Sequence, residues 1–192
     1  MKRVLVAAVA TYAVIAAPAL AGVASANEDP ASVVTFHDAH GDVVRGHDIR
    51  KVLLDNDNGH IKVKVWHRDL RSKRQYSFRL YLNTDLSTSK PEVKVYGAFP
   101  NADYAACTTT TWSTDGVHGC DPEDRATQCQ VDVVVRWKRD VTVFDSTRTG
   151  RCLAPASAVG VNVNFREYHP AHTRWDYALA RHVWYPPVPR DT

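Results

Sequence analysis

The chain has 192 residues, of which 23% are charged, and a formal net charge of +3. This length suits one domain with a substantial hydrophobic core. Basic residues cluster between Arg68 and Arg74, but aspartates are interspersed elsewhere and no basic stripe with interleaved aromatic residues appears, so the sequence argues against a nucleic-acid partner.

We expect residues 1–26 to be a cleavable secretory signal peptide. Lys2 and Arg3 precede an apolar stretch over residues 4–20, and small residues follow up to Ala26, which is the order of regions in such a signal. Cleavage after Ala21 is an alternative. An uncleaved membrane anchor is another, although the stretch is interrupted and falls short of the roughly 20 apolar residues that a bilayer requires.

Export implies a secreted, extracellular protein with no membrane span after processing. Residues 27–192 would then form a single domain, and the loss of Lys2 and Arg3 would lower the formal net charge from +3 to +1. Such an almost neutral chain gives no strong electrostatic pointer to a partner.

Beyond residue 26 the pattern predicts strands and turns, because apolar residues alternate or come in short β-branched runs. The clearest unit is a hairpin in which residues 49–54 and 60–67 flank Asn58 and Gly59, a pair that accepts positive φ in a tight turn. The other expected strands are 32–36, 76–82, 93–97, 131–137, 141–144 and 158–165.

About eight strands without a convincing amphipathic helix indicate an all-β fold, a two-sheet antiparallel sandwich of the jelly-roll or Ig-like kind. The segment 175–185 is ambiguous: it reads as a short helical turn over residues 176–180 followed by an edge strand. Three prolines, Pro186, Pro187 and Pro189, are then expected to stop regular pairing.

Four cysteines in an exported chain predict two disulfides: Cys107, Cys120, Cys129 and Cys152. With a turn at residues 138–140, positions whose numbers sum to about 278 face each other, so Cys129 lies near Cys152. This favours Cys129 with Cys152 and Cys107 with Cys120, while the other two pairings stay open. Zinc is the competing interpretation, but the spacings are wide and no C-x-x-C pair occurs.

Several short motifs follow one another along the chain in an order that resembles that of uncharacterised secreted actinobacterial β-sandwich proteins. They are Asp38-x-x-Gly41-Asp42, Asp48-Ile49, Ile61-x-Val63-x-Val65, Asp69-Leu70, Asn83-Thr84-Asp85 and Arg151-Cys152-Leu153-x-Pro155. The resemblance spans most of the chain after residue 26 and implies an extracellular β-sandwich, but no activity. Ala154 departs from the pattern, which has glycine after the leucine.

A loop near the start of the domain carries the strongest candidate metal ligands: His37, Asp38, His40, Asp42 and Asp48. The aspartates would suit calcium, and the two histidines zinc or another transition metal. A plain turn at Gly41 and Asp42 is the alternative, so the sequence establishes no cofactor and names calcium as the candidate. The segment 55–59 lacks the spacing of an EF-hand loop and fits a hairpin turn better.

Four tryptophans are candidate binding residues: Trp66, Trp112, Trp175 and Trp184. Exposed aromatic rings bind sugars by stacking, although most such rings pack in cores. Trp66 alternates with Val63 and Val65 in its strand, so we expect its ring to face outward.

The sequence has neither a G-x-S-x-G nucleophile motif nor a glycine-rich phosphate loop. We therefore expect a non-catalytic binding or accessory module whose ligand is a glycan or an extracellular protein. One alternative is a metal-dependent hydrolase built on His37 and His40 with acidic neighbours. Another is an interaction or inhibitor protein that uses the loop between Cys107 and Cys120.

Overall fold

The computed structural model describes residues 32–38, 47–100, 103–108, 131–147, 153, 157–167, 175–179 and 183–190. Within 103–108, Ala106 is the residue whose side chain is described. The expected signal peptide lies outside these ranges. In the part of the chain that is described, no helix is long and apolar enough to cross a membrane.

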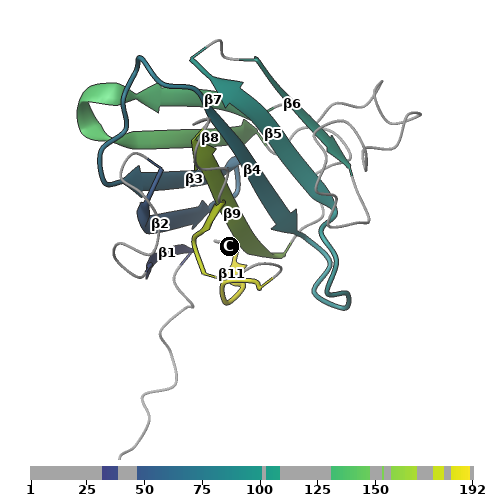
Figure 1. Ribbon diagram of the computed structural model, residues 1–192. Helices are drawn as coiled ribbons and strands as arrows, with labels where there is room; N and C mark the ends of the chain where they lie inside the picture. The colour runs from purple at the N-terminus through teal and green to yellow at the C-terminus, as the bar shows by residue number, and fades with distance from the viewer. Residues whose placement is uncertain are drawn as a thin grey trace, which may run out of the picture.

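Two antiparallel sheets pack against each other (Figure 1). The five-stranded sheet has the order β1-β2-β3-β8-β7, and the six-stranded sheet has the order β10-β9-β4-β5-β6 with β11 paired to β9. The bounds of the first sheet are β1 Val33–His37, β2 Ile49–Asn56, β3 His60–His67, β7 Val131–Arg136 and β8 Val141–Thr147. Those of the second are β4 Tyr76–Asn83, β5 Val93–Phe99, β6 Asp103–Thr108, β9 Ala158–Glu167, β10 Asp176–Tyr177 and β11 Val188–Pro189.

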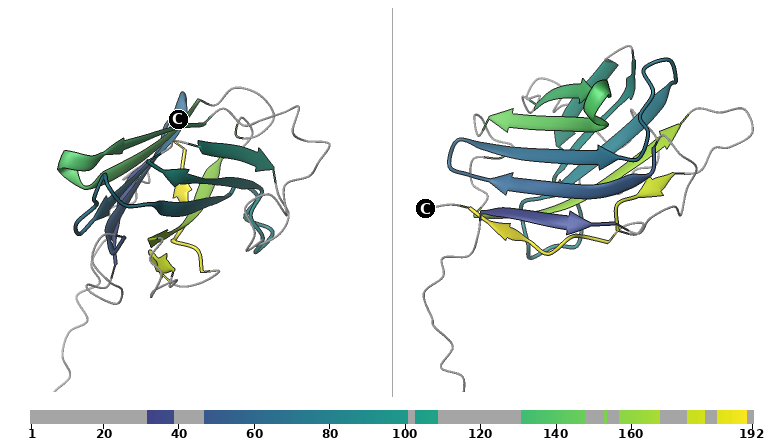
Figure 2. Two further views of the ribbon diagram at one scale, coloured as in Figure 1. Left: turned by 45° about the horizontal axis from the view of Figure 1, so that its top comes forward. Right: turned by 90° about the vertical axis from the view of Figure 1, so that its left-hand side faces the viewer.

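The core lies between the sheets, whose strands cross at an angle (Figure 2). Strand β3 buries alternate residues throughout, and β4 does so from Tyr76 to Leu80, because successive side chains of a strand point to opposite faces. Phe78 of β4 packs against Phe99 and Phe165 of its own sheet, with ring centroids 4.9 and 5.9 Å away, and against Phe144 of β8 at 5.3 Å. This aromatic cluster therefore joins the two sheets.

The hairpin between β2 and β3 forms as the sequence predicts. Asp57 Oδ1 accepts hydrogen bonds from the backbone N–H groups of Gly59 and His60, both at 2.6 Å. Aspartate commonly closes a turn in this way. The carboxylate thus serves the turn, in agreement with the hairpin interpretation of residues 55–59.

In the part of the chain that the structure describes, the prediction of an all-β fold with antiparallel sheets is confirmed, and every expected strand is present. The sheets hold more strands than the expected eight, since β6, β10 and β11 come in addition. Strand β6 was missed because small residues dominate Asp103–Thr108 and give no apolar alternation.

Two expectations about the C-terminal region are wrong. Asp176 and Tyr177 do not begin a helical turn but pair with Phe165 and Asn164 of β9. Pro189 does not end pairing either, because Val188 and Pro189 lie along β9. Proline retains its carbonyl acceptor, so it is tolerated in a strand at a sheet edge.

The hairpin of β7 and β8 differs by one residue from the expected register. Val131 faces Ser146 and Arg136 faces Val141, so paired positions sum to 277. The turn is a 3-10 helix, η2 (Trp137–Arg139), followed by Asp140 with φ of 52°. The cysteine argument used the other register; Cys120, Cys129 and Cys152 lie outside the described residues, and the side chain of Cys107 is not described, so both disulfides stay predictions.

Replacing Phe78 tests the aromatic cluster. Phe78→Ala leaves a cavity between the sheets and should lower the free energy of unfolding by about 3–5 kcal/mol. Val134→Ala, on the outer side of β7 where Val134 is 51% exposed, should change it by less than about 0.5 kcal/mol. Urea unfolding followed by tryptophan fluorescence measures both, and equal losses would contradict the assignment of the core.

Candidate functional site

The outer face of the five-stranded sheet, away from the core, carries side chains in rows that cross the strands. Directly opposite residues of neighbouring strands share a face, so the register fixes each row. The "basic row" is His37, Lys51, Trp66, Val141 and Arg136. The "acidic row", four residues further along β2, is Val33, Asp55, Lys62, Asp145 and Asp132.

Between these two rows lies a more apolar one: Thr35, Leu53, Lys64, Val143 and Val134. The face is therefore polarised, with cations at one end and carboxylates at the other. Lys62 is an exception in the acidic row, where its Nζ lies 3.1 Å from Asp145 Oδ2.

A pocket of about 500 Å³ opens at the basic end of this face. Its lining includes four cationic side chains: Arg50, Lys51, Arg68 and Arg139. The other described residues of the lining are His37, Trp66, His67 and Asp140. A cavity of this size accommodates a small molecule or one part of a polymer.

A β-bulge explains why two consecutive residues of β2 line the same pocket. The pairing of β2 with β3 shifts between Ile49 and Lys51, which leaves Arg50 as the extra residue. In a regular strand Arg50 and Lys51 would point to opposite faces. The bulge instead adds a second cation to the pocket beside the basic row.

Trp66 forms the aromatic part of the pocket. It lies on the outer side of β3, partly exposed, with the Lys51 ammonium 3.9 Å from its ring centre. A cation over an indole face is an attractive contact that holds both groups in place. The expected outward orientation of Trp66 is thus found in the structure.

Asp140 fixes the turn that carries Arg139. Its carbonyl accepts from His67 N–H at 2.8 Å, and its Oδ1 accepts from Leu70 N–H, also at 2.8 Å. The left-handed backbone at this position is one that aspartate tolerates better than most residues. The β7–β8 turn is thereby tied to the end of β3, and the two sides of the pocket are held together.

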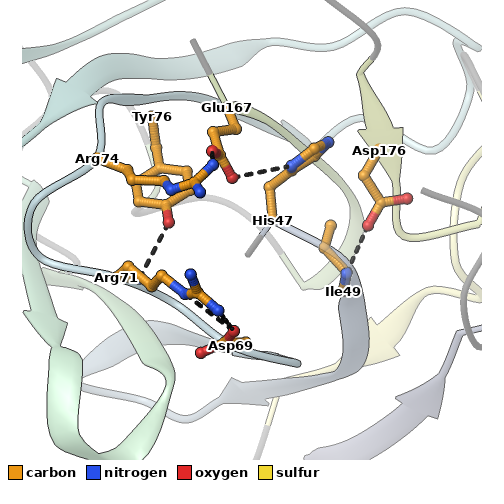
Figure 3. Close-up of polar contacts among 8 residues, drawn as sticks. All are labelled: His47, Ile49, Asp69, Arg71, Arg74, Tyr76, Glu167 and Asp176. Carbon is orange, nitrogen blue, oxygen red and sulfur yellow. Dashed lines mark hydrogen bonds and ion pairs between the residues drawn. The ribbon is translucent and has the colours of Figure 1, made fainter. Parts of the chain in front are cut away.

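Behind the pocket, several polar side chains are buried between the sheets (Figure 3). Glu167 pairs with Arg74, and its Oε2 lies 3.9 Å from His47 Nδ1. Asp176 accepts a 2.5 Å hydrogen bond from Ile49 N–H, which connects β10 with β2. The fully buried Asp48 lies 3.7 Å from Arg68 NH1, so its carboxylate partly neutralises the charge of Arg68 in the pocket.

His67 belongs both to the pocket and to this buried group. Its Nε2 lies within hydrogen-bond distance, 3.1 Å, of Thr142 Oγ1, and its ring packs edge-on against Phe165. Burial lowers the pKa of His67 to about 3, although a contact with the His47 backbone raises it; the charge of His47 adds a smaller lowering effect. His67 is therefore neutral at physiological pH and adds no charge to the pocket.

The candidate metal ligands are only partly covered by the structure. His37 is exposed, Asp38 is partly buried and Asp48 is buried beside Arg68, whereas His40 and Asp42 lie outside the described residues. Among the residues that are described, no group of three or more His, Cys, Asp or Glu side chains could hold a metal ion. Calcium or zinc binding by the complete set stays a prediction.

The tryptophans have separate surroundings. Trp175 lies beside the six-stranded sheet, with the guanidinium groups of Arg79 and Arg166 4.0 and 4.8 Å from its ring centre. Trp184 donates from Nε1 to the Ser89 carbonyl at 3.1 Å. Trp112 lies outside the described ranges. Of the three candidates that are described, Trp66 is the one that lines the pocket.

Comparison with known proteins finds no matching family model and no matching curated protein. The sequence had indicated Trp66 and His37 but not Arg50, Arg68 or Arg139 as site residues. Arg68 stands out in the sequence only as one end of the basic cluster between Arg68 and Arg74. Alternation along β2 and β3 could have placed Lys51 beside Trp66, but the bulge and the turn have no clear sequence signal.

Substitution of Asp140 tests the turn. Asp140→Ala removes the acceptor for Leu70 N–H and puts alanine in a left-handed conformation, so the free energy of unfolding should fall by about 1–3 kcal/mol. Asp140→Asn retains an acceptor and tolerates the conformation, and should cost clearly less. Urea unfolding measures the loss of stability in each variant. Equal losses in Asp140→Ala and Asp140→Asn would contradict a contribution of the Leu70 hydrogen bond and the left-handed conformation to stability.

The low pKa of His67 predicts a pH dependence of stability. The unfolded chain binds a proton at His67 below pH 6.5 whereas the folded chain does so only near pH 3, so stability is lost as the pH falls through this window. At pH 5 the loss from this group should be about 2 kcal/mol.

Unfolding of the wild type and His67→Gln between pH 7.5 and 4 measures this contribution. The glutamine variant should lose less stability on acidification, because the titrating group is gone. His37→Gln, which removes an exposed imidazole, serves as the control and should follow the wild type. Parallel curves for His67→Gln and the wild type would contradict the assignment.

Proposed function

We propose that the protein is a secreted, non-catalytic binding module that holds an extracellular glycan on the outer face of its five-stranded sheet. The observation that carries this proposal is the pocket of about 500 Å³ beside Trp66, whose ring is partly exposed and fixed by Lys51. An indole face stacks on the apolar face of a sugar ring, while neighbouring polar groups bind its hydroxyls.

The chemistry of the lining favours binding over glycoside hydrolysis. Such hydrolysis requires two carboxyl groups about 5–10 Å apart across the cleft. The described lining of the pocket offers one carboxylate, Asp140, and this group already accepts a hydrogen bond from Leu70 N–H. The other polar groups of the lining are mainly cations, which recognise a ligand but do not supply an acid and base pair.

Two alternatives depend on segments beyond the described residues. A metal-dependent hydrolase would need His40 and Asp42 together with His37, and an inhibitor would need the loop between Cys107 and Cys120. Neither has a supporting contact among the described residues that compares with the pocket at Trp66. Secretion, the two disulfides, the jelly-roll or Ig-like topology and a structural calcium ion accompany the proposal as expectations from the sequence.

Trp66→Ala tests the proposal. Loss of the ring should weaken glycan binding by at least about tenfold, whereas Trp66→Tyr should retain a large part of it. Affinity electrophoresis in gels containing different polysaccharides, followed by calorimetric titration with the best ligand, measures the effect.

The matched control is Trp175→Ala, which removes a tryptophan beside the other sheet. Circular dichroism and urea unfolding would verify that all variants remain folded. Unchanged binding by Trp66→Ala, or a loss of binding in Trp175→Ala alone, would overturn the location of the site. Failure of the wild type to bind any glycan would overturn the proposal itself.

A further inference from the structure

We infer that the pocket is selective for an acidic saccharide, one that bears carboxylate or sulfate groups, and that the bound chain runs across the strands along the basic row. This inference rests on the proposed glycan-binding function and specifies the ligand class. It depends on two features of the outer face, the uncompensated charge of the pocket and the carboxylates at the opposite end of the sheet.

The charge in the pocket is strongly unbalanced. Within the described residues, neither Arg50 nor Arg139 has an ion pair, and both side chains are exposed. Lys51 is engaged with the uncharged ring of Trp66, so its positive charge is not cancelled. Asp140 is the single carboxylate among the described lining residues, and because Leu70 N–H is neutral its charge stays, so the described lining has four cations against one anion.

Arg68 adds a fourth cation with partial compensation. Its NH1 lies 3.7 Å from Asp48, but Asp48 is fully buried and presents no carboxylate to the pocket. Four cations around a cavity leave a positive potential that attracts anions and repels cationic ligands. A neutral sugar would use Trp66 but gain nothing from this potential.

Arginine is well suited to the expected ligand groups. Its planar guanidinium presents two parallel N–H donors that match the two oxygens of a carboxylate or sulfate. Arg50 and Arg139 come from different parts of the first sheet, the β2 bulge and the β7–β8 turn, and both line the same pocket. An acidic sugar ring can therefore contact Trp66 while its charged group binds an arginine.

The acidic row sets the direction of a longer ligand. Asp55 lies four residues from Lys51 along β2, which corresponds to about 13 Å. A polyanion lying parallel to the strands would pass Lys64 of the middle row and then reach Asp55, Asp132 and Asp145, whose three carboxylates outnumber Lys62 in that row, and be repelled. A chain that crosses the strands follows the basic row instead and reaches Arg136 on β7, over a sheet width of about 19 Å for five strands.

Calorimetric titration with three probes tests the ligand class: a heparin-derived hexasaccharide, a polygalacturonate hexasaccharide and an uncharged mannan hexasaccharide. We expect binding of at least one acidic probe to be at least about tenfold tighter than mannan binding and to weaken with added NaCl. Arg50→Glu and Arg139→Glu should each weaken acidic-probe binding by about tenfold or more, without weakening mannan binding.

Lys90→Glu is the matched control for these variants. It makes the same change in net charge at an exposed position between β4 and β5 of the other sheet, and it should leave binding within about twofold. Equal weakening by Lys90→Glu and Arg50→Glu would overturn the inference in favour of a general charge effect. Mannan binding that is as tight as acidic-probe binding and is lost in Trp66→Ala would overturn the inference but leave the proposed function intact, whereas no binding of any glycan would overturn both.

Ligand length tests the direction of the chain. Two heparin-derived probes are compared, a disaccharide and a dodecasaccharide. Arg136→Glu should weaken dodecasaccharide binding at least about fivefold more than disaccharide binding, because only the longer chain reaches β7. If Asp132→Asn strengthens dodecasaccharide binding and Arg136→Glu has no effect, the chain follows the strands and this part of the inference is wrong.

Discussion

The pleat of strand β3 connects the interior of the sandwich to the chemistry of its surface. Ile61, Val63 and Val65 must all face the core for the two sheets to pack, so the residues between them must face outward. A shift of one residue in the pairing would bury Lys64 and Trp66 and expose the valines. The hydrophobic effect on one side of the sheet therefore determines which polar side chains gather on the other.

The requirement that apolar residues face the interior is weaker at the pocket end of the sheets, because several polar side chains are buried there. Glu167 and His47 are buried there, Glu167 pairs with the partly exposed Arg74, and Asp176 binds the backbone of Ile49. Buried charges of this kind contribute little net stability, since their desolvation offsets most of their attraction. They do fix geometry, because a buried polar group without its partner is costly. The residues behind the pocket are thus held in place by polar contacts as well as by packing on buried neighbours such as Phe165.

Much of the fold could be predicted from the sequence, because apolar residues recur at every second position in most strands. The failures occur where the period is absent or interrupted. Strand β6 consists mainly of small residues, Val188 and Pro189 form too short a strand to show a pattern, and Asp140 adds a residue to the β7–β8 turn through a conformation that few residues adopt. The site was less predictable than the fold. Trp66 could be placed on the outer face by alternation alone, whereas Arg50 and Arg139 reach the pocket through a bulge and a turn that the composition does not reveal.

Overall charge was also a poor guide to the surface. The chain is nearly neutral and its sequence contains no basic stripe, yet pairing of β1, β2 and β3 aligns His37 with Lys51 and Trp66, and β7 adds Arg136. The acidic row argues against a nucleic-acid duplex as the ligand of this alignment. A duplex presents two phosphate backbones separated by grooves about 6–12 Å wide. If one backbone followed the basic row, the other would approach Asp55 and Asp132, about 13 Å away. A single acidic chain avoids this repulsion, so the arrangement of charges discriminates by the width of the polyanion as well as by its sign.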